Sequence, residues 1–326
     1  MKYQIITFAL LALFSYQAYC QIHVETLHEF NKWSAKHNKV FDSDQLKYRL
    51  SIFAENYQKI KEHNNNSTNT YTLGLNEYAH MTSQEFASLI LTPSVSKSQK
   101  SQHRPKPKPQ PHPTTKIIPI DWRNKGAVTS VKSQGKCGSC WSFSSAALME
   151  AFQYFKTGKL IDLSEQQLVD CDNSSFDKSF YSDGCNGGYH QEAIAYASQY
   201  GILPAADYPY VYKQQPCAIK SPTKNGYYPK GVVFVDGTPQ GILQALQSSP
   251  VSVKVDATNW HLYRSGIFNN CQNPVTNHDV LAVGNDEQGN YIIKNSWGTT
   301  WGTNGYMLLQ AGETCGVDEL PITIQL

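Results

Sequence analysis

The segment QGKCGSCWSF, Gln134 to Phe143, places two cysteines two residues apart. Three kinds of site use this spacing: a zinc knuckle, a redox dithiol, and a reactive thiol beside a structural disulfide. A zinc site needs a second pair of cysteines or histidines at matching spacing, and the sequence lacks one. A redox dithiol follows a strand in a thioredoxin-like βαβ pattern, which is also absent. The number of cysteines in the chain helps to decide among these three kinds of site.

Residues 1–20, MKYQIITFALLALFSYQAYC, have the pattern of a secretory signal. Lys2 precedes an apolar run from Ile5 to Phe14, and Ala18 and Cys20 suit cleavage before residue 21. The run is shorter than the roughly 20 apolar residues of a membrane-spanning helix. We therefore expect a secreted protein, in which disulfides persist.

Loss of Cys20 with this signal leaves 8 − 1 = 7 cysteines, so six can pair and one thiol is left over. Cys140 begins a helix-like run, where unpaired N–H groups and the helix dipole favour a thiolate. A thiolate that attacks an acyl carbon also needs a proton donor, usually histidine, and a group to orient it. The segments NHDV and KNSWG supply candidates. The odd count thus favours Cys137 in a disulfide and Cys140 as the nucleophile.

The elements around these residues change character along the chain. Residues 140–159 are helix-like with Gly158 as a stop, and SEQQLVDC opens with a capping-box pattern at Ser164 and Gln167. Short strand-like segments follow at residues 250–257, 278–286, 290–297 and 305–312. Helices followed by strands predict an α+β fold with a cleft between two lobes.

The front of the chain is organised differently. Residues 24–64 show helical spacing of apolar residues, and a short strand-like piece follows at residues 71–81. Residues 94–115 are rich in Ser, Gln, Lys and Pro, which predicts an exposed linker open to proteolysis. The net charge of +2 and 40% hydrophobic content indicate a globular chain and give no sign of a nucleic-acid or membrane partner.

Several motifs together resemble the papain and cathepsin cysteine proteases. CGSCW, LSEQQLVDC, GCNGG, an NH before a strand, and KNSWGTTWG occur in that family's order. The resemblance implies a papain-like two-lobed fold, with a helical lobe at about 125–228 and a β-barrel-like lobe at about 229–326. It also implies a signal peptide at 1–20, an inhibitory propeptide at 21–93, a linker with the maturation site at 94–116, and a peptidase at 117–326.

The family's catalytic roles fall on matching positions. Cys140 resembles the nucleophile, and His278 resembles its ion-pair partner and general acid/base. Asn295 is similar to the residue that orients the imidazole, and Trp297 to the ring that shields that hydrogen bond. Gln134 resembles the side-chain donor of the oxyanion hole, whose second donor is the backbone N–H of Cys140. No metal or organic cofactor is implied.

The resemblance also implies how the cysteines pair. The expected bridges are Cys137–Cys185, Cys171–Cys217 and Cys271–Cys315, and Cys140 remains free. Each bridge typically contributes about 2–4 kcal/mol to stability.

Substrate binding is implied at a further set of positions. Gly187 and Gly188 resemble the stretch whose backbone pairs with an extended substrate. Tyr189, Lys254, Asp279 and Leu320 fall where the family has the walls of an apolar pocket for the second residue before the scissile bond. Small apolar residues usually stand at 254 and 279. We expect Lys254 and Asp279 to contact each other, with apolar or aromatic substrate residues still preferred.

The propeptide motif of the cathepsin L-like branch is recognisable in the front segment. Arg49, Phe53, Asn56, Ile60 and Asn64 match it, with Gln45 where Glu is expected. GLNEYAH resembles the next propeptide motif, with Tyr78 for Phe and His80 for Asp. Because histidine changes charge at about pH 6.5, we hypothesise that His80 contributes to pH sensing during activation.

An endopeptidase is favoured over an exopeptidase, because residues 172–184, the insert between two cysteines, contain no His or Cys that could serve a cleft-blocking structure. The expected partners are protein and peptide substrates and the chain's own propeptide. A monomer is expected, located in a lysosome, a vacuole or the extracellular medium, with no stable membrane association. The alternatives are a catalytically silent binding or storage protein and a thiol-disulfide oxidoreductase, and alkylation of the native protein would separate them.

Overall fold

The structure, a computed structural model, describes residues 24–92 and 117–325. These form two units, one of residues 24–69 and 73–82 and one of residues 70–72 and 83–325. The predicted signal peptide and the predicted linker after residue 93 lie outside the described residues. In the part of the chain described, no helix combines the length and the apolar character needed to span a bilayer.

The first unit is built on two helices, residues 24–36 and α2 (Ser43–Asn65). The Asp42 side chain caps α2 by accepting the N–H of Gln45 at 2.8 Å. Phe53 is fully buried and packs on the rings of Phe30 and Trp33 at centroid distances of 5.2 Å. The helix predicted here is therefore present, and its aromatic contacts account for the apolar periodicity.

Two asparagines of α2 bond to backbone groups of the segment that follows. Asn56 donates from Nδ2 to the carbonyl oxygens of Ala79 and Met81, both at 2.9 Å. Asn64 bonds to both the N–H and the C=O of Leu73 at 2.9 Å. The strand expected over residues 71–81 is accordingly short, because β1 spans only Tyr71–Leu73 and side chains hold much of the rest in turns.

His80 lies at the end of this segment among aromatic rings. Its ring centroid is 5.3 Å from that of Trp33 and 5.5 Å from that of Phe41. Arg49 donates from Nη1 to the carbonyl oxygen of His80 at 3.2 Å. The position that the family gives to Asp is thus occupied by an imidazole packed on aromatic faces.

The helices of the second unit are α3 (Ser83–Ile90), α4 (Cys140–Thr157), α5 (Glu165–Cys171), α6 (His190–Tyr200), α7 (Pro239–Leu246) and the 3₁₀ turns η2 (Gly184–Asn186) and η3 (Thr314–Gly316). As predicted, α4 ends at Gly158, whose left-handed φ of 69° suits glycine. Ser164 caps α5 by accepting the N–H of Gln167 at 2.9 Å. Only half of the expected capping box forms, because Oε1 of Gln167 accepts the N–H of Leu203 and the N–H of Ser164 donates to the Leu203 carbonyl oxygen instead.

The strands form one mixed sheet ordered β1-β5-β8-β7-β6-β4-β9-β3, with β2 paired to β6. Their bounds are β2 Ile120–Asp121, β3 Val232–Phe234, β4 Val251–Val255, β5 Tyr263–Phe268, β6 His278–Asn285, β7 Tyr291–Lys294, β8 Tyr306–Leu309 and β9 Ile322–Ile324. The four predicted strands correspond to β4, β6, β7 and β8. The sheet does not close on itself, so the β lobe is an open sheet and not the expected barrel-like one.

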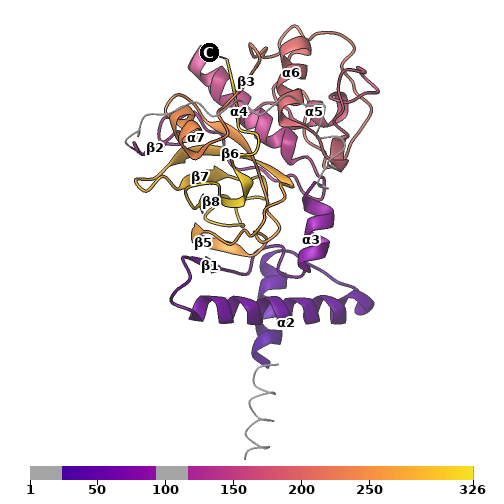
Figure 1. The fold of residues 1–326 in the computed structure, drawn as a ribbon. Coiled ribbons are helices and arrows are strands. Elements are labelled where there is room, and N and C mark those ends of the chain that lie inside the picture. The colour runs from indigo at the N-terminus through magenta and orange to yellow at the C-terminus, as the bar shows by residue number, and fades with distance from the viewer. Residues whose placement is uncertain (1–23, 93–116, 326) are drawn as a thin grey trace, which may run out of the picture. The chain divides into compact units, whose positions relative to one another are not determined.

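Figure 1 shows the helices α5 and α6 grouped together and the strands β5 to β8 grouped apart from them in the second unit. The two groups share one core, in which Trp141 and Leu148 of α4 cluster with Leu281 of β6. Every residue of β6 is buried. Helix α4 of the helical lobe begins at Cys140, and strand β6 of the β lobe begins at His278. The packing of α4 on β6 therefore joins the two lobes.

Candidate active site

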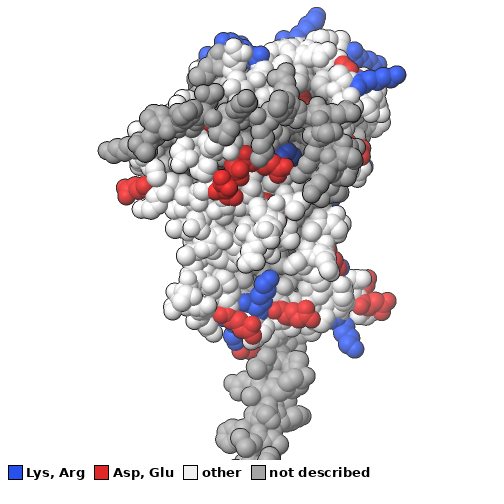
Figure 2. Space-filling view, viewed as in Figure 1, with Lys and Arg blue, Asp and Glu red and all other residues white. Residues whose placement is uncertain are grey.

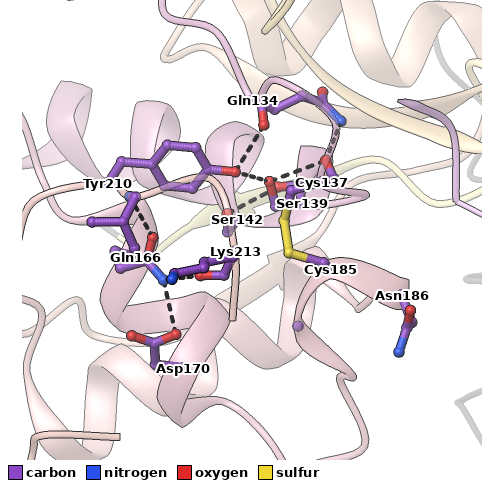
Figure 3. Close-up of a disulfide and its surroundings, with 12 residues drawn as sticks. Gln134, Cys137, Ser139, Ser142, Gln166, Asp170, Cys185, Asn186, Tyr210 and Lys213 are labelled. Carbon is purple, nitrogen blue, oxygen red and sulfur yellow. Dashed lines mark hydrogen bonds between the residues drawn. A yellow bond between two sulfur atoms is a disulfide. The ribbon is translucent and has the colours of Figure 1, made fainter. Parts of the chain in front are cut away.

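The loop that leads into α4 is fixed by a disulfide and by hydrogen bonds. Cys137 is bonded to Cys185, and the N–H of Gly138 donates to the carbonyl oxygen of Cys185 at 2.9 Å (Figure 3). The hydroxyl oxygens of Ser139 and Tyr210 are 2.7 Å apart. The other bridges are Cys171–Cys217 and Cys271–Cys315, and Cys140 is the free cysteine of the described residues. Cys137 and Cys140 are therefore not a pair, and the bridges are those that the family resemblance implies.

Cys140 lies at the first position of α4 and is fully buried. The backbone N–H groups of Asp279 and Trp141 favour the thiolate and act to lower the pKa of the thiol. Burial outweighs them and, with the Asp279 charge, raises the pKa of the thiol to about 12. The thiolate expected from the helix position is thus not the stable form here, because the covered site withholds water from the charge.

The imidazole of His278 is held on one side only. Nε2 lies 2.8 Å from Oδ1 of Asn295, and the Trp297 ring lies 4.7 Å from the imidazole centroid. Nδ1 is buried and has no hydrogen-bond partner among the described residues. Because Asn295 Oδ1 also accepts the N–H of Ser296, it is an acceptor, which makes Nε2 the donor and leaves a lone pair on Nδ1.

Burial also lowers the pKa of His278 to about 4, although the hydrogen bond to Asn295 opposes the change. The thiol and the imidazole are therefore both neutral in the covered site. A neutral imidazole with a free Nδ1 lone pair is able to accept a proton.

Gln134 is fully buried and is held at both ends of its amide. Oε1 accepts the hydroxyl of Ser296 at 2.7 Å, and Nε2 donates to the carbonyl oxygens of Ile90 and Cys137, each at 2.9 Å. An N–H donor fixed in this way, in the loop that leads to Cys140, is suited to bind a carbonyl oxygen of a bound chain.

The segment from α3 to Thr92 occupies this site within the second unit. Beyond the bond from Gln134 to Ile90, Thr92 donates to the carbonyl oxygen of Asn277 from its N–H at 3.0 Å and its hydroxyl at 2.9 Å. The ring of Phe86 meets that of Trp297 edge to face at 4.9 Å. The sequence analysis did not single out these residues, although Phe86 and Ile90 stand at helical spacing and are both buried.

The residues expected in the substrate pocket include a set of charges in contact. Lys254 Nζ is 3.4 Å from Oδ2 of Asp279, so the expected contact is present. His190 Nδ1 is 3.3 Å from Oδ1 of Asp279, and Lys254 lies 5.9 Å from the ring centroid of Tyr189. The sequence analysis missed His190, which is fully buried at the start of α6 and directly follows Tyr189. Leu320 lies next to this set, because its carbonyl oxygen faces the His190 ring.

The glycines expected to bind substrate differ in their surroundings. Gly188 lies against Trp141, and a β-carbon there would be 2.4 Å from a ring atom of that tryptophan. Gly187 has a φ of 126° and accepts the N–H of Asp183 at 2.8 Å. Both positions therefore require glycine for local reasons, and their backbone is fixed beside the disulfide at Cys185.

The charges on the face shown in Figure 2 form small groups on a largely uncharged surface. The net charge of +2 is likewise close to balanced. The electrostatic features that distinguish the site are thus local and buried.

Comparison with known proteins finds matches to two families along this chain. Residues 118–324 match the family described as "Papain family cysteine protease", and residues 30–86 match "Cathepsin propeptide inhibitor domain (I29)". Papain from Carica papaya is 41% identical over 292 residues, which cover 87% of this chain and 81% of papain. Cathepsin L 2 from Paramecium tetraurelia is 36% identical over 304 residues, which cover 91% and 92% of the two chains.

A solved structure is similar over nearly the same extent. The ragweed pollen allergen Amb a 11, a cysteine protease determined in its proform, superposes with a TM-score of 0.81 at 33% identity. The match covers 92% of this chain and 94% of that one. The similarity therefore includes the segment that precedes the catalytic part in both chains.

Proposed function

Because the chain belongs to the papain family of cysteine proteases and carries a cathepsin propeptide inhibitor domain, we propose that it is the zymogen of a cysteine endopeptidase. Cys140 is the nucleophile and His278 the general acid/base. The observation that carries the proposal is the hydrogen bond from His278 Nε2 to Asn295. Among the described residues it leaves Nδ1 without a partner, and Cys140 is the free cysteine there.

The proposed reaction begins with transfer of the Cys140 thiol proton to Nδ1 of His278. The thiolate attacks the carbonyl carbon, and the oxygen takes the charge beside two donors, Gln134 Nε2 and the Cys140 N–H. When the C–N bond breaks, the imidazolium gives its proton to the departing amine and a thioester remains. His278 then takes a proton from water, and the hydroxide releases the acid and restores the thiol.

Inhibition by the propeptide follows from the same contacts. The Ile90 carbonyl is bonded to Gln134 Nε2, the group that we assign to the oxyanion. Thr92 is bonded to the carbonyl oxygen of Asn277, the neighbour of His278. This segment therefore competes with substrate, and by covering the site it also keeps Cys140 and His278 uncharged.

The proposal includes the organisation of the precursor. Residues 1–20 direct the chain into the secretory pathway, residues 21–93 inhibit it, and cleavage near residues 116–119 releases a monomeric peptidase of residues 117–326. Family members of the cathepsin type typically work in the secretory pathway or the lysosome, which supports a lysosomal, vacuolar or extracellular location. Substrate binds along Gly187 and Gly188 and beside Trp297, with its second residue before the scissile bond near Tyr189, Lys254, Asp279 and Leu320.

Hydrolysis of a fluorogenic Phe-Arg amide tests the proposal. The full chain is treated with acid and thiol, and its processing is followed beside that of Cys140→Ala. Turnover that appears with loss of the front segment and is absent in the variant supports a cysteine endopeptidase. Folded and processed protein that cleaves neither this amide nor a mixture of unfolded proteins would overturn it.

A further inference from the structure

Asp279 places a negative charge next to the proposed nucleophile. It directly follows His278 at the start of β6 and pairs in register with Lys254 of β4. Its carboxylate adds to the burial that raises the pKa of the Cys140 thiol. Only 1% of the side chain is exposed, so water screens the charge poorly. A buried carboxylate here opposes the thiolate that the reaction requires, and the chain must compensate for it.

The carboxylate is fixed between the two lobes. Besides Lys254 on β4, it contacts His190 of α6, whose Nδ1 is also 2.7 Å from the Ser252 hydroxyl. The Ser252 hydroxyl is in turn 2.5 Å from that of Ser144 on α4. Four elements thus hold Asp279 in one place, and its effect on Cys140 cannot be relieved by rotation into solvent.

Lys254 supplies the opposite charge at the same place. Its ammonium acts on the Cys140 thiol in the direction opposite to Asp279 and lowers the pKa of the His278 imidazole. Burial alone would lower the pKa of Lys254, but the attraction of the Asp279 carboxylate is stronger. The pKa of Lys254 therefore lies above its usual value. The lysine therefore stays charged throughout the range in which a protease works.

We propose that the Lys254–Asp279 ion pair sets the pH range in which Cys140 and His278 form their reactive ion pair. Lys254 balances Asp279, so that the thiolate remains accessible in acid. The two are positioning residues, since neither exchanges a proton with substrate. The inference rests on the proposed function, and it goes beyond the family resemblance, which places small apolar residues at both positions.

Other ionisable groups face the pair and must be considered. His190 is neutral, because burial holds its pKa well below the usual value. The phenols of Tyr189 and Tyr210 have raised pKa values through burial and are also neutral. Glu319, which acts on both Lys254 and Asp279, accepts the Thr276 hydroxyl at 2.6 Å. The charges that act on the Cys140 thiol itself are those of Asp279 and Lys254. Burial raises the pKa of Asp279, and the neighbouring Lys254 opposes this change.

The signs of the expected effects are opposite for the two residues. Lys254→Met leaves Asp279 uncompensated, which raises the pKa of both Cys140 and His278. The acid and alkaline limbs of the pH profile should then both move up by about one unit. Asp279→Asn keeps the backbone N–H and removes the charge, so both limbs should move down by a similar amount. The double variant should return close to the wild-type profile.

The experiment measures the rate of alkylation of Cys140 by iodoacetamide as a function of pH. Full-length variants are activated in acid, and the rate is followed from pH 3 to 10 by mass spectrometry, as the gain in mass when iodoacetamide alkylates Cys140. Iodoacetamide is small and uncharged, so the result does not depend on how the pocket binds a substrate side chain. Lys159→Met is the matched control, because it removes a lysine beyond the far end of the 18-residue α4, about 27 Å from Cys140.

Opposite shifts in the single variants, and near-normal profiles in Lys159→Met, Lys254→Arg and the double variant, support the inference. The inference is overturned if the limbs of the pH profile do not shift in the single variants, or if they shift in the same direction in both. This holds even where activity falls, because a residue with only a structural role lowers the rate without moving both limbs. If Lys254→Met does not fold, Lys254→Arg and Asp279→Asn carry the same test. A wild-type protein that alkylates at Cys140 but hydrolyses nothing contradicts the proposed function instead.

Discussion

Two buried polar clusters of the second unit differ in how many of their side-chain nitrogen and oxygen atoms have hydrogen-bond partners. The active-site cluster consists of Gln134, Cys140, His278 and Asn295, and the lysine cluster of Lys132, Glu150, Glu165 and Lys294. In the active-site cluster, His278 Nδ1 and Asn295 Nδ2 are buried without hydrogen-bond partners among the described residues. In the lysine cluster, every buried side-chain nitrogen and oxygen has a partner.

The charged groups of the lysine cluster are all paired through ion pairs and hydrogen bonds. Lys132 Nζ reaches three carboxylates, Glu150 at 2.8 Å, Glu165 at 2.7 Å and Asp162 at 3.1 Å, which matches its three N–H donors. Glu150 also accepts the N–H of Leu163 at 2.9 Å. Buried charges are stabilising only when they are bonded in this way. Of these two clusters, the one that contains the proposed nucleophile has the buried side-chain atoms without hydrogen-bond partners among the described residues.

Cys140→Ala has the largest expected effect on the active-site side of the comparison. Removing the nucleophile should lower kcat/KM by at least about a thousandfold, because no other group can form the thioester. Stability should change little, since the sulfur makes few strong contacts. Turnover and urea denaturation of the same preparation check both halves. Residual activity above about a tenth of wild type would remove Cys140 from its proposed role.

Glu150→Ala tests the lysine cluster in the opposite way. It leaves Lys132 with one fewer partner and the Leu163 N–H unbonded, so the unfolding free energy should fall by about 3–5 kcal/mol. Urea denaturation is measured in the Cys140→Ala background, which prevents self-digestion. A decrease in unfolding free energy below about 1 kcal/mol would show that the lysine cluster contributes little to the fold. It would contradict the contrast drawn with the active-site cluster.

Gln134→Ala should affect the rate more than the fold. Loss of one oxyanion donor typically lowers kcat by about 100-fold or more. Gln166→Ala is the matched control, because Gln166 is equally buried but bonds to Asp170 and Lys213. The expected result is a kcat loss for Gln134→Ala that the control does not share. Equal losses in the two variants would assign Gln134 a structural role only.

How much of this site the sequence could predict depends on the range of the interactions. The helix from Cys140 to its stop at Gly158 was predictable, because its apolar spacing and cap are local. The cysteine pairing came from the family resemblance, since spacing alone leaves many connectivities open. The thiol pKa was not predictable, because it depends on burial and on the charges of Asp279 and Lys254, which lie far away in the sequence.

The open sheet and the position of His190 illustrate the same limit. Strands β3 and β9 have three residues each, and they pair with each other at Val232–Phe234 and Ile322–Ile324, while β9 also pairs with β4. His190 resembles any surface histidine in sequence, yet it is buried against Asp279 by the packing of α6 on the sheet. Such long-range contacts carry no local signal.

Glu165→Gln is the smallest expected effect and concerns the pH dependence of the lysine cluster. Burial raises the pKa of Glu165 to about 7, and the neighbouring Glu150 charge adds to this despite the bond to Lys132. Burial would likewise protonate Glu150, but the two lysines prevail and lower its pKa. Of the two acids that share Lys132, Glu150 therefore stays charged, and Glu165 keeps its proton up to about pH 7.

The sign of the effect follows from linkage. A carboxyl whose folded pKa is raised contributes stability that is complete below its unfolded pKa of about 4.5 and is lost as pH rises to about 7. Glu150, with a lowered pKa, contributes in full over this same range. The wild-type unfolding free energy should therefore fall between pH 4.5 and 7.5, and Glu165→Gln should reduce that fall by about 1–2 kcal/mol. Urea denaturation at the two pH values in the Cys140→Ala background measures it, with Gln166→Ala as the control. An unchanged or steeper fall in Glu165→Gln would mean that Glu165 is ionised when buried, and that Lys132 bonds both carboxylates as charges.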